Sequence, residues 1–142
     1  MDCGDTFLMP APGGAATPHL WIIVTQPDPQ TQECAIVSVT TLRNSKDQTV
    51  ILRVGDHPFI RHDSTIFYGD AMIVDARRLE AEIAAGLALV REKCSPTTLK
   101  LVQDGVAVSP FTRPKILRSA GSTGGDSGNR VQSRGTAQID QK

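Results

Sequence analysis

The sequence predicts a mainly β fold with a C-terminal helix, arranged as a small and strongly bent β-barrel. Two observations lead to this expectation. Short segments rich in β-branched and apolar residues fill the first two thirds of the chain, and clusters of Gly, Pro and Asp separate them, as is typical of barrels. After these segments, apolar residues at helical spacing follow the dipeptide Ser95-Pro96.

The strand segments share the β-branched and apolar residues that favour strands. The second is almost continuously apolar, which indicates a central strand. Gly69-Asp70 separates two of the segments, and a glycine at such a place often marks a bulge or a bend. The predicted strands are Asp5–Met9, Leu20–Thr25, Cys34–Leu42, Thr49–Val54, Ser64–Tyr68, Ala71–Val74 and Leu87–Glu92.

Helix signals are confined to the last part of the chain. A short helical segment is expected just before Gly86, which is a typical helix-ending residue. A longer helix is predicted over Pro96–Val108, with Ser95 as its N-cap and Pro at its first position. Pro110 prevents this helix from continuing much further.

Composition excludes several functional classes. The 142 residues include 15 basic and 15 acidic side chains, so the chain does not coat nucleic acid by bulk charge, although a local basic groove stays open. The longest apolar run, Leu20–Val24, is far shorter than the ~20 residues of a membrane span, so no membrane partner is expected. The 3 cysteines are widely spaced and the N-terminus does not resemble a secretion signal, which predicts reduced thiols in a cytoplasmic protein.

The C-terminal stretch Ser119–Lys142 is rich in Gly, Ser, Gln and Thr. Such a composition cannot bury enough apolar surface to offset its ordering entropy, so we predict one folded domain over 1–118 and a disordered tail over 119–142. Three basic residues precede the tail in the segment FTRPKILR, namely Arg113, Lys115 and Arg118. We interpret this segment as a solvated linker edge, with a phosphate-contacting arm as the alternative.

Four stretches occur in an order that resembles a known family. They are Gly4–Leu8 (GDTFL), Ala35–Thr41 (AIVSVTT), the segment Asp63–Leu79 with its DSTIFY, IVD and RRL pieces, and the helical Ser95–Ser109. Together they resemble the PemK/MazF growth-inhibitor toxins, which are SH3-like barrels of bacterial toxin–antitoxin systems. The resemblance implies a homodimeric endoribonuclease that cleaves single-stranded RNA without a metal or cofactor and is blocked by an antitoxin protein.

The family's chemistry rests on an Arg in the loop before the second strand and on a Thr or Ser at the end of the third. Thr41 matches the second of these residues. The loop Pro10–Pro18 contains no Arg, and His19 follows it directly. Histidine supplies acid and base near neutral pH, so we expect His19 to act as general acid or base, with Thr41 and His62 in support.

Five further residues are expected to bind the RNA: Arg43, His57, Arg61, Ser64 and Tyr68. Among them, Ser64 is a candidate for binding phosphate and Tyr68 for stacking on a base. Two alternatives remain open. One is a metal site formed by His57, His62 and Asp63. Because their spacing lacks the paired ligands of a structural zinc site, we predict no metal. The other is a binding module, an SH3-like barrel that binds a partner without cutting RNA.

Overall fold

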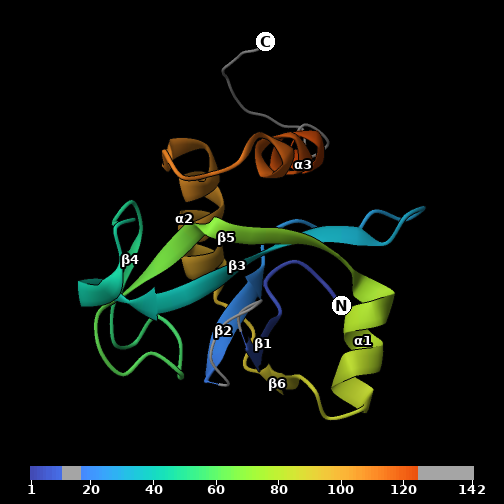
Figure 1. Cartoon of the computed structure of the whole chain (residues 1–142), viewed down its shortest axis with the longest axis horizontal. Helices are drawn as coiled ribbons and strands as arrows, with labels where there is room; N and C mark the ends of the chain where they lie inside the picture. Colours follow the sequence, from blue (N-terminus) through green and yellow to red (C-terminus); the bar gives the residue numbers. More distant parts are fainter. Residues whose placement is uncertain (11–16, 125–142) are drawn as a thin grey trace.

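The computed structural model describes residues 1–10 and 17–124, which form a curled antiparallel sheet with helices on both faces (Figure 1). In this part of the chain the sheet has 6 strands in the order β4-β5-β3-β2-β1-β6. The mainly β character predicted from the sequence is therefore confirmed. The strands are β1 (Thr6–Pro10), β2 (Pro18–Ile23), β3 (Glu33–Thr41), β4 (Ile51–Leu52), β5 (Ser64–Asp75) and β6 (Leu89–Arg91).

The helices divide between the two faces of the sheet. They are the 3₁₀ helix η1 (Leu42–Asn44) and the α-helices α1 (Ala76–Ala84), α2 (Pro96–Val108) and α3 (Pro114–Gly124). Val102 and Val106 of α2 and Ile116 of α3 belong to one apolar cluster. Leu79 of α1 belongs to a second cluster on the opposite face. None of the helices in the described ranges is long and apolar enough to cross a bilayer.

Strand β3 shows why the sequence is apolar at successive positions. Val37 and Val39 point into the cluster beneath α2 and α3, whereas Cys34 and Ile36 point into the cluster beneath α1. Because side chains alternate along a strand, a strand covered on both faces must be apolar throughout. The same alternation holds in β2, where Trp21 and its neighbour Leu20 lie in different clusters and both are fully buried.

The two strand segments predicted around Gly69-Asp70 form one strand, β5, with an irregularity at this point. Ile36 of β3 pairs with Met72, and Ser38 pairs with Phe67, so one β3 residue lies opposite several residues of β5. The predicted bulge is therefore present, but the predicted division into two strands is wrong, because β3 pairs with β5 on both sides of the bulge.

The predicted strand Thr49–Val54 is reduced to the two residues of β4. The buried carboxylate of Asp47 takes Thr49 out of the ladder, because it accepts hydrogen bonds from the Thr49 backbone N–H and hydroxyl. The same carboxylate accepts hydrogen bonds from the Tyr68 N–H and the Ser109 hydroxyl, at 3.2 and 2.7 Å. Asp47 thus links this loop to β5 and to the end of α2.

The predictions for α1 and α2 are confirmed. The Ser95 side chain accepts a hydrogen bond from the Thr98 N–H, so it caps α2, which spans Pro96–Val108 as predicted. Helix α1 ends just before Gly86, whose φ of 81° lies in the left-handed region that favours glycine.

The segment expected to be a linker edge is instead the start of α3. Ile116 is 1% exposed in the core, and the Arg113 guanidinium donates a hydrogen bond to the carbonyl of Ala71. The helix continues to Gly124, so the domain boundary predicted at residue 118 falls inside it. Its second half is rich in Gly, Ser and Thr, which explains why composition suggested a tail. The rest of that predicted tail, residues 125–142, lies outside the described part of the chain.

Candidate functional site

The side chains of Thr41 and His62 meet at one end of the sheet. The Thr41 Oγ1 lies 3.2 Å from the His62 Nε2. The two residues line an open cleft of about 670 Å³ together with Leu42, Arg43 and Asp63. Three residues that the sequence singled out separately, Thr41, Arg43 and His62, therefore share one cleft.

Pairing between β3 and β5 fixes this arrangement. Thr41, the last residue of β3, is paired with Ser64, the first residue of β5. Just beyond the sheet, the Leu42 N–H donates a hydrogen bond to the Asp63 carbonyl at 3.1 Å. The Ser64 hydroxyl donates to the His62 carbonyl at 2.9 Å. These bonds hold the backbone of His62 beside Thr41.

Arg43 supplies the guanidinium that lines the cleft. Its side chain is exposed, and no carboxylate of the described residues lies within ion-pairing distance of it. The one carboxylate in the cleft, Asp63, is paired with Arg53 at 2.7 Å. Because this exposed pair reduces the local negative charge, Arg43 leaves the cleft able to receive an anion.

The His62 imidazole keeps one basic nitrogen in either neutral tautomer. Its Nε2 either donates a proton to Thr41 Oγ1 or accepts the hydroxyl proton, and the distance of 3.2 Å fits both. His62 is exposed, so solvent and a ligand can both reach its ring. An exposed imidazole with a hydroxyl partner and a nearby guanidinium can bind a phosphodiester and move a proton on it.

His19 is not part of this cleft. It lies on β2, where its neighbour Leu20 pairs with Val39 of β3. Because side chains alternate, His19 lies on the face of Trp21, whereas Thr41 lies on the opposite face with Val39. The His19 Nδ1 is 3.3 Å from the carbonyl of Val39. The sequence grouped His19 with Thr41 and His62, and the structure brings together only the latter two.

His57 is a buried structural residue, 3% exposed. Its Nδ1 accepts a hydrogen bond from the Phe59 N–H at 3.0 Å, so the ring proton is on Nε2. Nε2 lies 2.6 Å from the carbonyl oxygen of Glu92, which also accepts a bond from the Thr6 hydroxyl. Both nitrogens of His57 are therefore engaged, and they anchor the loop before β5 to the segment that follows β6.

The other residues expected to bind RNA differ in their exposure to solvent. Tyr68 is fully buried and donates to the Val102 carbonyl at 2.6 Å. Burial is also the main cause that raises the pKa of its hydroxyl above the ordinary value. Ser64 is buried and holds the His62 backbone, so it positions the site although it does not line the cleft. Arg61 is exposed next to His62 in the chain.

The metal alternative is not supported by the geometry. His57 is engaged elsewhere, and within the described ranges no three His, Cys, Asp or Glu side chains gather in a way that would hold a metal ion. The loop Pro10–Pro18, in which the resembling family carries its Arg, falls largely on residues 11–16, which lie outside the described residues.

The sequence did not identify Leu42 and Asp63 as residues that line the cleft. It also did not identify Arg53 as the ion-pair partner of Asp63. The sequence named Thr41, Arg43 and His62 but could not place them in one cleft, because the approach of His62 to Thr41 depends on which strands pair. No family model matches the chain, and no curated protein matches it.

Proposed function

We propose that this protein is an endoribonuclease that cleaves single-stranded RNA without a metal, as the PemK/MazF toxins do, and that Thr41, His62 and Arg43 form its site. The observation that carries this proposal is the contact between Thr41 Oγ1 and His62 Nε2 in an open cleft that Arg43 also lines, with no ion-pair partner for Arg43 among the described residues. These groups match the needs of RNA cleavage, which are a proton acceptor, a proton donor and a cation at the phosphate.

The proposed reaction uses the 2′-hydroxyl of the RNA itself. His62 removes its proton, the 2′ oxygen forms a bond to the adjacent phosphorus, and the bond from phosphorus to the 5′ oxygen breaks. The imidazolium returns the proton to the departing 5′ oxygen, which leaves a 2′,3′-cyclic phosphate and a 5′-hydroxyl. Arg43 binds the phosphate oxygens as their charge grows, and Thr41 orients the imidazole.

The fold is compatible with this proposal at a coarse level. A curled antiparallel sheet packed against the helix Pro96–Val108 supports a small β-rich fold of the kind that the proposal requires. The further expectations, a homodimer, an antitoxin partner and a cytoplasmic location, belong to the same proposal.

The direct test is incubation of the purified full chain with a single-stranded RNA oligonucleotide in EDTA, followed by analysis of the product ends. We expect fragments with cyclic phosphate ends. An equal amount of an Arg43→Ala variant should cleave at least roughly 10²-fold more slowly, because one lost transition-state donor typically costs that much. If wild-type protein leaves the RNA intact, the enzyme proposal fails.

The second candidate is a non-catalytic binding module, and one observation favours it. The cleft contains one histidine, so a single imidazole must both accept and return the proton. Fluorescence anisotropy with the same oligonucleotide separates the two functions. Binding that Arg43→Ala weakens, without any cleavage, would identify the cleft as a binding site for RNA alone.

A further inference from the structure

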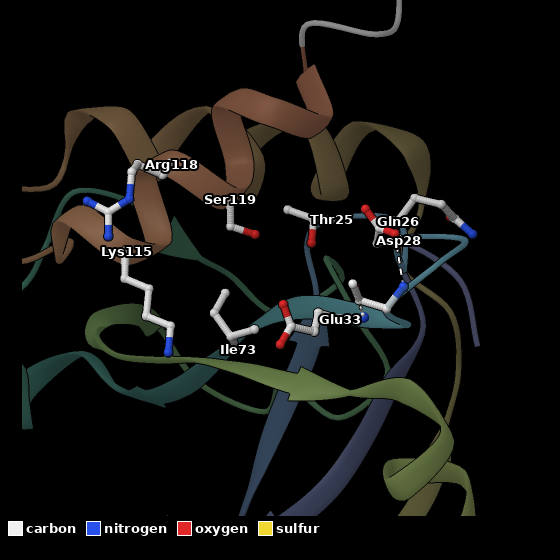
Figure 2. Close-up of a pocket in the computed structure, with 9 residues that line it drawn as sticks. Thr25, Gln26, Asp28, Glu33, Ile73, Lys115, Arg118 and Ser119 are labelled. Carbon is white, nitrogen blue, oxygen red and sulfur yellow. Dashed lines mark hydrogen bonds between the residues drawn. The ribbon is translucent and has the colours of Figure 1, made fainter.

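A second cleft, of about 310 Å³, lies between α3 and the turn that joins β2 to β3 (Figure 2). Glu33 at the start of β3 lines this cleft, whereas Thr41 at the end of the same strand lines the first. At the strand rise of about 3.3 Å per residue, the two clefts are on the order of 25 Å apart. The second cleft is therefore separate from the proposed RNase site.

One end of this second cleft is basic. Lys115 and Arg118 are three residues apart on α3, so their side chains lie on the same side of the helix. Figure 2 shows both at one end of the cleft. The helix itself is fixed, because Ile116 is buried in the core and Arg113 is bonded to the backbone of β5.

The other end is acidic. Asp28 lies there, away from the two basic side chains, and Glu33 lies between the two ends beside Ile73 (Figure 2). The backbone N–H groups of Thr31 and Gln30 donate to the Asp28 carboxylate at 3.1 and 2.8 Å. These bonds hold the pKa of Asp28 below its usual value, so the carboxylate stays charged at neutral pH.

None of the ion pairs found in the described ranges joins Lys115 or Arg118 to Asp28 or Glu33. Ile73 adds an apolar side chain to the wall between the two ends. The cleft thus carries two cations at one end, the Glu33 carboxylate beside Ile73 in its middle and the Asp28 carboxylate at the other end.

We propose that this cleft binds a small zwitterion, a free amino acid or a dipeptide. Its carboxylate would bind to Lys115 and Arg118, and its ammonium group would bind to Glu33 and Asp28. Arginine pairs with carboxylates through two parallel hydrogen bonds, and the volume suits a small ligand. A simple anion or an RNA phosphate fits less well, because either would meet Glu33.

The test is a titration of the isotope-labelled full chain, followed by amide chemical shifts. The probes are glycine, L-leucine and the dipeptide Gly-Gly, with acetate and methylammonium as ligands that carry only one of the charges. We expect a zwitterion to shift the amides of Glu33, Ile73 and Arg118, and to bind at least about tenfold more tightly than either single-charge ligand. Tighter binding of Gly-Gly would identify the ligand as a dipeptide, and tighter binding of glycine or L-leucine would identify it as a free amino acid.

Two variants make the test specific. Arg118→Ala and Glu33→Gln should each weaken binding at least about tenfold, whereas Lys100→Ala, an exposed lysine of α2, should leave it unchanged. The proposal is overturned if no zwitterion shifts these amides up to about 10 mM, or if acetate binds as tightly as glycine. RNase activity is not part of this measurement, so its result is independent of the first proposal.

Discussion

Gly105 of α2 shows how one residue sets the distance between a helix and the sheet. A Cβ atom at this position would overlap the Tyr68 hydroxyl and a methyl group of Val50. The Tyr68 hydroxyl can therefore reach the Val102 carbonyl only because residue 105 has no side chain. This close approach holds α2 against β5.

We expect Gly105→Ala to destabilise the protein by about 1–3 kcal/mol, because overpacking shifts α2 away from Tyr68. The matched control is Gly121→Ala in α3, where the added Cβ would meet open space. That change should be neutral or slightly stabilising. Urea unfolding of both variants measures the difference, and equal stability of the two would contradict the packing described for Gly105.

Arg53 acts on the cleft through its ion-pair partner, Asp63. It neutralises Asp63 beside the His62 imidazole. We expect Arg53→Ala to weaken binding of single-stranded RNA, since the freed carboxylate repels phosphate, and Asp63→Ala to strengthen it. Anisotropy titrations at two salt concentrations check this, because the effect should shrink as salt screens the charges. Equal affinities for both variants at low salt would remove Asp63 from the binding surface.

At the scale of single elements, α1 depends on its N-cap. The Asp75 carboxylate accepts a hydrogen bond from the Arg77 N–H and pairs with the Arg77 guanidinium at 3.1 Å. The Arg77 side chain is the main cause that holds the pKa of Asp75 below its usual value. A carboxyl with a lowered folded-state pKa stabilises the fold above its unfolded pKa of about 4, and this contribution is lost as the pH falls through the folded pKa.

We therefore expect Asp75→Asn to lower the melting temperature at pH 7, and the gap between the two proteins to shrink as the pH falls below about 4 and the wild-type carboxyl becomes protonated. Thermal unfolding of both proteins across this range measures the gap. A gap that stays constant with pH would show that the charge of Asp75 contributes nothing to α1.

Helix α3 offers a second test at this scale. Ile116 is buried and Leu117 is 40% exposed on the same helix. Removing the buried side chain leaves a cavity, so we expect Ile116→Ala to cost about 2–5 kcal/mol and Leu117→Ala much less. Equal effects, measured by urea unfolding, would mean that α3 does not dock on the sheet.

Local sequence patterns predicted most helices and strands, but not which of them come into contact. Ser95 and Gly86 act through neighbours in the chain, so the limits of α2 and the end of α1 followed from the sequence. The contact between Thr41 and His62 depends on the pairing of β3 with β5, which local patterns do not specify. His57 was expected at the RNA, yet its burial against Glu92 depends on the distant strand β6.

At the scale of the whole molecule, the sheet ends in two edge strands, β4 and β6. In β6, Leu89 and Val90 are each 58% exposed, and an apolar exposed edge favours association. The proposed function also implies a homodimer. We expect light scattering at micromolar concentration to give about twice the chain mass of 15.2 kDa. A monomer at these concentrations would argue against this assembly.

The proposed mechanism assigns proton transfer in RNA cleavage to His62 and to no other histidine. The most direct measurement compares the initial cleavage rates of wild type, His62→Ala and His19→Ala on one single-stranded RNA in EDTA. Because a general acid or base typically contributes roughly 10²–10⁴-fold, His62→Ala should lose that much. His19→Ala, on the other face of the sheet, should stay close to the wild-type rate. Activity that survives His62→Ala, or that depends on His19 instead, would contradict the account.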